Sequence, residues 1–376
     1  MYAALLSVGL VLTILVGCNI GGSTTGPAFG PAVGANVIGT GVAATLMTVC
    51  FALGALTVGP EVVDTLAVDL LRDQSVFTLR SSAAVLLMIG GALLVGNYAG
   101  VPASTSMTAV GAVSALGLAT GELDWSVLSE IAVWWIVAPI VGFWVAGVVG
   151  RYFYPRLDEW LALETRTRDR PMVTVASAGF APRFRLGSSA DRREAAGSLS
   201  VIAIGCATAY ASGTSNIANA IAPLYATGAM ALTPLVLLGS AAVAVGAFTI
   251  ARRTLETVGS DITELPLTAA IIVTVVSAGL VVFLSWLGIP ASFVVIATMS
   301  IVGLGWGRAT RTTAHPNAAA GGERATPGDD GDSVPAASDL FDPATTARVL
   351  LVQNIVPVVA TVGTFVLFQF GPLFEF

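Results

Sequence analysis

Long apolar runs alternate with short polar breaks along most of the chain. A helix needs about 20 mostly apolar residues to cross a lipid bilayer, and seven runs are long enough to predict membrane-spanning helices. They cover residues 2–18, 36–58, 83–99, 128–150, 231–250, 266–287 and 345–369. The pattern therefore predicts an all-α integral membrane protein.

Four further apolar segments are short and are interrupted by Gly, Pro, Ser and Thr. They cover residues 19–34, 101–119, 198–230 and 289–307. Irregular backbone at membrane depth is tolerated only where protein groups or a water-filled cavity supply hydrogen-bond partners. We therefore expect these segments to form paired re-entrant or broken helices around a polar site.

Two polar stretches divide the apolar sequence. Residues 151–197 separate a first membrane repeat (1–150) from a second one (198–376), and residues 308–344 form a polar loop inside the second repeat. The loop is rich in Gly, Ala, Asp and Pro, a composition that predicts disorder.

The two halves share short sequence matches at a constant spacing. Residues 100–104 (GVPAS) recur as 288–292 (GIPAS), 188 positions later, and residues 116–117 recur as 304–305 at the same offset. Interrupted segments in corresponding places of two related halves are typical of secondary transporters built from inverted repeats. The spacing therefore predicts an inverted-repeat transporter.

Charged residues are sparse and unevenly placed. They make up 11% of the chain, the 17 basic residues are all Arg, and the net charge is −6. This composition excludes an ordinary soluble enzyme and gives no basic footprint for nucleic acid. Fifteen of the Arg residues lie in 151–197, 250–265, 308–344 and at Arg348. By the positive-inside rule these loops are cytoplasmic, and both termini of this multi-pass plasma-membrane protein lie outside.

Several motifs resemble those of a known transporter family. The run GGSTTGPAFGPAVGA (21–35) is similar to the first signature of the inorganic phosphate transporter (PiT) family, GANDVANAFGTSVGS. The run GTSNIANAIAP (213–223) is similar to its second signature, GSNDVANAIGP. Residues 102–106 (PASTS) resemble the family's P-V-S-T-T-H element, of which 290–292 (PAS) survives in the second half, and 135–139 (WIVAP) resembles W-x-x-S-P. The chain is identified as a divergent member of this family.

The resemblance implies import of inorganic phosphate by alternating access, coupled to Na⁺ or H⁺. In this chain Thr24 and Asn216 occupy the positions of the two signature Asp residues, and Met107 that of the family's His. Sodium is normally bound by anionic oxygen ligands. We therefore expect only a weak sodium site, near Thr24 and Asn216, and weak dependence of uptake on sodium.

The polar residues that remain in these motifs suit a tetrahedral oxyanion, which accepts hydrogen bonds. Hydroxyl and amide side chains donate such bonds, and half-helix N-termini add backbone N–H groups. The expected substrate-binding residues are Ser23, Thr24, Thr25, Ser104, Thr105, Ser106, Ser215, Asn216, Asn219 and Ser292. The competing interpretation is that small hydroxyl residues only support helix packing, as they do in many membrane bundles.

The sequence contains no P-loop, dinucleotide fingerprint or metal-ligand cluster, and its single histidine, His315, lies in a polar loop. We expect neither an enzyme nor a bound cofactor. The alternatives to a phosphate transporter are a permease for sulfate or another oxyanion, a passive oxyanion channel, and a degenerate family member that acts as a sensor or partner subunit. Homodimers are common among such folds.

Overall fold

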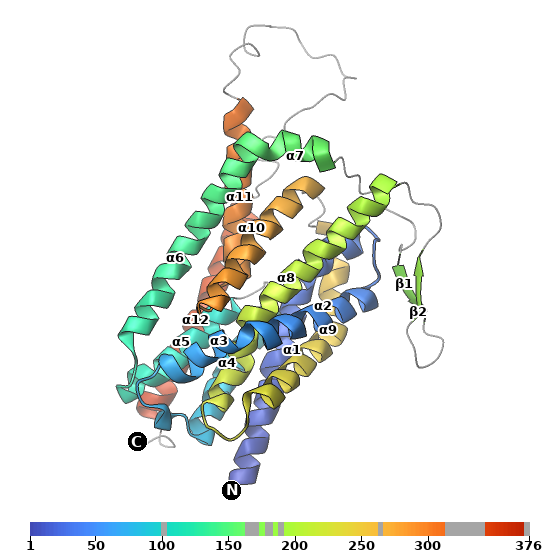
Figure 1. Cartoon of the computed structure of the whole chain (residues 1–376). Helices are drawn as coiled ribbons and strands as arrows, with labels where there is room; N and C mark the ends of the chain where they lie inside the picture. Colours follow the sequence, from blue (N-terminus) through green and yellow to red (C-terminus); the bar gives the residue numbers. More distant parts are fainter. Residues whose placement is uncertain are drawn as a thin grey trace.

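The protein is a bundle of long helices (Figure 1). A computed structural model describes residues 1–98, 104–161, 173–176, 183–186, 192–261, 266–312 and 343–371. Its α-helices are α1 (Tyr2–Gly34), α2 (Thr40–Thr57), α3 (Gly59–Asp64), α4 (Leu79–Tyr98), α5 (Thr105–Thr120), α6 (Trp125–Val148), α7 (Tyr154–Leu161), α8 (Arg192–Tyr225), α9 (Leu232–Asp261), α10 (Leu267–Trp286), α11 (Phe293–Thr312) and α12 (Pro343–Phe370). The shorter elements are π-helices η1 (Thr65–Asp69) and η3 (Val149–Phe153), 3₁₀-helix η2 (Gln74–Val76), and strands β1 (Val173–Ala176) and β2 (Arg183–Leu186).

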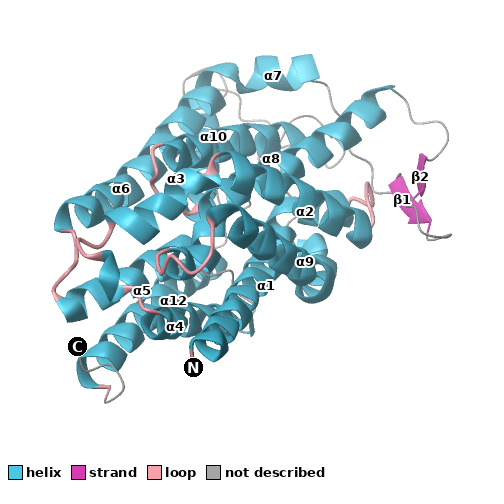
Figure 2. Cartoon of the chain, turned by 60° about the horizontal axis from the view of Figure 1, so that its bottom comes forward, coloured by secondary structure: helices cyan, strands magenta, loops and turns pink. Residues whose placement is uncertain are grey.

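Eight helices in the described part of the chain are long and apolar enough to cross a membrane. They are α1, α2, α4, α8, α9, α10, α11 and the continuous run from α6 into α7. Two shorter apolar helices, α5 and the Asn354–Phe370 part of α12, accompany them. The prediction of an all-α membrane protein is confirmed. The two short strands form an antiparallel hairpin within 151–197, and Figures 1 and 2 place it outside the helical bundle.

The predicted boundaries of two broken segments are wrong. Residues 19–34 continue the first span as one 33-residue helix, α1, although Pro27 and Pro31 lie inside it. Likewise, the segment 198–230 lies largely in the continuous 34-residue helix α8. The physical reason is packing: Gly21 of α1 lies directly against the backbone of α9 at Val243, and such close contact outweighs the local preference of Pro and Gly for a break.

The predicted broken segments 101–119 and 289–307 do contribute to helical hairpins. The α4–α5 hairpin begins and ends at one end of the bundle, because the segment before α4 pairs with the turn after α5. The Arg72 N–H donates to the Glu122 carbonyl over 2.8 Å, and the Asp124 N–H donates to the Leu70 carbonyl over 3.0 Å. The α10–α11 hairpin approaches from the opposite end, which carries α7 (Figure 1).

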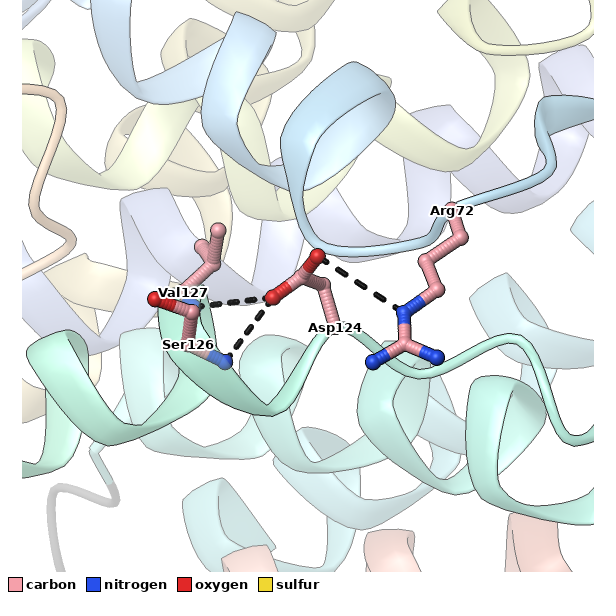
Figure 3. A network of polar contacts seen from close by, with 4 residues as sticks. All are labelled: Arg72, Asp124, Ser126 and Val127. Atoms are coloured by element: carbon pink, nitrogen blue, oxygen red, sulfur yellow. Dashed lines mark hydrogen bonds and ion pairs between the residues drawn. The ribbon is translucent and has the colours of Figure 1, made fainter.

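Asp124 fixes the start of α6 and the base of the α4–α5 hairpin together (Figure 3). One carboxylate oxygen, Oδ1, accepts the N–H groups of Ser126 and Val127 over 2.8 and 3.3 Å, which caps the helix. The other oxygen lies 3.8 Å from Nε of Arg72. Because both side chains are partly exposed, this ion pair contributes about 0–1 kcal/mol, and most of the stabilisation comes from the cap.

The tip of the α10–α11 hairpin is specified by the sequence Gly288-Ile289-Pro290. Gly288 has a φ of +76°, which an L side chain disfavours, and the Ile289 N–H donates to the Leu284 carbonyl over 2.8 Å. This pattern is a Schellman motif that ends α10. Pro290 follows and cannot continue the helix. The tip therefore turns sharply before α11 begins at Phe293.

The helices of the two halves pair in a reciprocal way. Helix α1 packs on α9 and α2 on α8, while α6 packs on α11 and α5 on α12. Glycines allow backbone-to-backbone contact at these crossings, at Gly213 against Phe51, and at Gly303 against Phe143. Helices α4 and α10 each contain 20 residues and start 188 positions apart, which is the offset of the sequence matches. The domain boundaries at 1–150 and 198–376 stay a prediction.

Candidate substrate site

A small polar cavity lies where α1 and α8 meet the first residues of α5 and α11. The cavity is open on one side, and its space, together with that of the opening, is about 430 Å³. Its lining residues are Ser23, Thr24, Pro27, Ser104, Thr105, Thr208, Ser212, Asn216, Ser292, Phe293 and Val294. Eight of these carry a hydroxyl or amide group, and no charged side chain is among the described lining residues.

Two helix N-termini face this cavity. Ser104 caps α5, where its hydroxyl accepts the Met107 N–H over 3.4 Å, and Ser292 directly precedes α11. The first-turn N–H groups of a helix have no partner inside the helix, and the helix dipole makes that end positive. The cavity therefore presents backbone donors from two hairpins that enter from opposite ends of the bundle.

Two of the four predicted broken segments, 101–119 and 289–307, supply these helix N-termini, and the other two do not. The two signature runs lie inside the continuous helices α1 and α8, where backbone N–H groups are engaged in helical hydrogen bonds. The free N-terminal turns come instead from α5 and α11, directly after the two Pro-Ala-Ser runs. Signature residues therefore contribute side chains to the cavity, and the hairpin tips contribute backbone.

The hydroxyls on α1 act mainly as acceptors in this arrangement. Thr24 donates to the Ile20 carbonyl over 2.6 Å, and Ser23 donates to the same oxygen over 3.1 Å. Because each hydroxyl has a single hydrogen, these two oxygens offer only lone pairs to the cavity unless their hydrogens rotate. Thr25 is fully buried, donates to Gly21, and does not line the cavity.

Asn216 connects α8 to the start of α5. Its side-chain oxygen accepts hydrogen bonds from the hydroxyls of Thr105 over 2.8 Å and Ser106 over 3.3 Å, and from the Asn219 amide over 3.3 Å. Since the oxygen is saturated by these donors, the N–H groups of the Asn216 amide are the ones free to bind a ligand in the cavity. The network thus orients this amide as a donor.

Ser106 and Ser215 hold the second hairpin tip and do not line the cavity. The Ser215 hydroxyl donates to the Ala291 carbonyl over 2.9 Å, and the Ala291 N–H donates to the Ser215 oxygen over 3.1 Å. The Ser106 hydroxyl lies 3.1 Å from the same carbonyl and 3.3 Å from the Asn216 oxygen, and its single hydrogen is donated to one of the two at a time. Asn219 is also fully buried behind the cavity, and its side-chain oxygen has no hydrogen-bond partner among the described residues. Six of the ten predicted residues line the cavity, and three others support it from behind.

Thr208 and Ser212 line the cavity but were missed from the sequence. They precede Asn216 by eight and four positions, so all three occupy one face of α8. A prediction of one continuous helix over residues 198–230 would have placed Thr208 and Ser212 on the same face as Asn216. Thr24 and Asn216, the positions expected near a weak sodium site, both lie in the cavity wall.

Comparison with known proteins agrees with this architecture. The structure resembles that of "the sodium-dependent phosphate transporter" with a TM-score of 0.67 and 18% identity, over 98% of this chain and 100% of that one. The sulfate permease CysP of Bacillus subtilis (strain 168) is 28% identical over 300 residues, which are 79% of this chain and 76% of the permease. The profile of the Phosphate transporter family matches residues 20–356. The chain therefore belongs to the phosphate transporter family and is a multi-pass membrane transporter, not an enzyme.

Proposed function

We propose that this protein imports inorganic phosphate across the plasma membrane by alternating access around the polar cavity. The observation that carries the proposal is the composition of the cavity. The Asn216 amide of α8 and two helix N-termini supply donors, the Ser23 and Thr24 hydroxyls of α1 supply acceptors, and no carboxylate in the described lining would repel an anion. Such a set of donors suits a tetrahedral oxyanion.

Alternating access is supported by the arrangement of the two hairpins. Their first-turn residues meet at one cavity, although the hairpins enter from opposite ends of the bundle. The reciprocal pairing of α1 with α9 and of α2 with α8 is what two inverted repeats would produce. A site between such repeats can open to either side as one hairpin or the other moves.

The proposed orientation puts both termini outside. Figure 1 shows the start of α1 and the end of α12 at one end of the bundle and α7 at the other. The end with α7 carries Arg151, Arg156 and Arg308, and the Arg308 guanidinium lies 4.3 Å from the centre of the Tyr154 ring. By the positive-inside rule this end is cytoplasmic. A homodimer in the membrane remains a prediction.

Concentrative uptake of an anion needs a coupled cation. Moving one net negative charge inward against an interior-negative potential costs about 2.3 kcal/mol per 100 mV. Thr24 and Asn216 offer neutral oxygen and amide groups where a carboxylate would bind sodium more strongly. We therefore propose weak sodium coupling and a larger role for protons, which phosphate itself carries as the singly charged anion.

Sulfate is the second candidate substrate, and one observation favours it. Sulfate is fully deprotonated near neutral pH and needs only donors, whereas a phosphate OH needs an acceptor, and no carboxylate is among the residues found to line the cavity. The lone pairs of Ser23 and Thr24 are acceptors that keep phosphate possible. The 28% identical relative is named as a sulfate permease.

Transport by the purified protein in liposomes separates these possibilities. Labelled phosphate and labelled sulfate are offered in parallel, each with the other anion as competitor, with an imposed proton or sodium gradient. Accumulation of phosphate above equilibrium that excess sulfate does not inhibit supports the proposal. The opposite preference would establish a sulfate permease, and equilibration without accumulation would establish a channel. Liposomes without protein are the control.

A further inference from the structure

The tip of the α10–α11 hairpin is held from two sides. On the side of the polar cavity, Ser106 and Ser215 bind the backbone of Ala291. On the other side, the indole Nε1–H of Trp135 in α6 donates to the Pro290 carbonyl over 2.8 Å. Two successive carbonyl groups of the tip are thus bound by side chains from three helices.

A second, smaller hollow lies behind this tip, with about 210 Å³ of space including its open side. It is lined by Met107, Trp134, Trp135, Ala138, Pro139, Ala291, Ser292, Val295 and Ile296, so that Ser292 is its sole hydroxyl among the described residues. Ser292 also lines the polar cavity, and the tip therefore forms the partition between the two spaces.

We propose that Trp135 is a positioning residue for the hairpin tip, and that the cavity behind the tip is the space into which Ala291 and Ser292 retreat when the polar cavity opens. This inference rests on the proposed alternating access. Retreat breaks the bonds of Ser106 and Ser215 to Ala291 and widens the polar cavity. Met107, a flexible side chain in the wall of the receiving space, adapts to the incoming backbone.

Two substitutions in α6 act on this movement in opposite directions. Trp135→Phe keeps an aromatic ring but removes the N–H, which frees the tip. Ala138 is 1% exposed and forms part of the wall of the receiving cavity. Ala138→Leu therefore fills this cavity and obstructs the retreat of the tip. Trp125→Phe and Ala132→Leu are matched controls on exposed positions of the same helix.

The test measures how fast a small hydrophilic thiol reagent labels Ser292→Cys. Cys18, Cys50 and Cys206 are first replaced by Ser in the full chain, and open membrane fragments expose both faces to the reagent. We expect Trp135→Phe to accelerate labelling and Ala138→Leu to slow it, each relative to its control. In transport, Trp135→Phe should raise KM by about 2- to 12-fold, the effect of one lost hydrogen bond, with kcat retained.

Opposite shifts in labelling support the proposal, and unchanged rates or shifts in the same direction overturn it. If Trp135→Phe does not accumulate in the membrane, Ala138→Leu alone decides, because slower labelling supports the retreat and an unchanged rate contradicts it. Labelling requires no transported substrate. A failure of the proposed phosphate transport would therefore show in the uptake assay and leave the labelling result intact.

Discussion

Thr105 and Asn216 lie 111 positions apart in the chain, yet the Thr105 hydroxyl donates a hydrogen bond of 2.8 Å to the Asn216 side-chain oxygen. This contact joins the N-terminus of α5 to the middle of α8, two walls of the polar cavity. Because the oxygen accepts this bond, the Asn216 N–H groups are the ones that remain for the cavity. The first prediction follows from this pair.

Replacing Thr105 with Val keeps the shape of the side chain and removes its hydroxyl. In a desolvated site the loss of one donor costs about 1–3 kcal/mol, or roughly ten- to a hundredfold in affinity. We expect KM for the transported oxyanion to rise by such a factor. Thr120→Val, at the far end of the same helix, should leave KM unchanged. Equal kinetics for both variants would remove Thr105 from the site.

Three substitutions test the site assignment more widely. Ser23→Ala removes a hydroxyl from the cavity wall, Ser215→Ala releases the Ala291 backbone, and Asn219→Ala removes a donor from Asn216. Each should weaken uptake while folded protein remains in the membrane, as judged by size-exclusion chromatography. Near-normal uptake kinetics in all three variants would contradict the assignment.

The sodium dependence of uptake should be weak and should increase when carboxylates are restored. The double variant Thr24→Asp, Asn216→Asp places two anionic oxygens in the wall of one cavity. Its uptake should depend more steeply on external sodium, measured at fixed pH and membrane potential. The single variant Thr24→Asn controls for side-chain size, because Asn216 already has the size of an Asp side chain. A steep, saturable sodium requirement in the unaltered protein would show that neutral ligands are sufficient.

Close packing of α6 on α11 requires a glycine at position 303 but not at position 305. A Cβ at Gly303 would overlap the Phe143 carbonyl, whereas a Cβ at Gly305 would meet nothing within 4 Å. Overpacking of this kind costs about 1–3 kcal/mol. Gly303→Ala should therefore lower the thermal unfolding temperature in detergent, and Gly305→Ala should not. Similar unfolding temperatures for both variants would contradict the close contact between α6 and α11.

The orientation in the membrane is testable with single cysteines at exposed described positions. Ser126→Cys lies at the start of α6, and Trp160→Cys lies on α7, where the Trp side chain is 80% exposed. In a background without Cys18, Cys50 and Cys206, an impermeant reagent applied to intact cells should label only Ser126→Cys. Permeabilised cells provide the control. Labelling of both positions from outside would reject the topology.

The sequence predicts the tip of the α10–α11 hairpin better than it predicts helix continuity, for a physical reason. Gly288 and Pro290 end a helix through their own backbone conformations, so this helix end can be predicted from the local sequence alone. Pro27 and Pro31 carry the same local signal, but α1 continues through them because α9 packs tightly on its glycines. The misplaced break concealed that Thr208 and Ser212 share a face with Asn216. Tertiary contacts thus determine that α1 and α8 are continuous helices, which the local sequence does not indicate.

The glycine contacts between α6 and α11 have a consequence for how the chain can change shape. Gly303 and Gly307 bring α11 against the backbone of α6, so neither helix can slide along the other without side chains colliding. A helix of the first half is thereby bound to a hairpin of the second, and α5 is bound to α12 in the reciprocal way. Under the proposed alternating access, each half thus carries part of the moving machinery of the other, and a half expressed alone would lack the surface on which its helices pack.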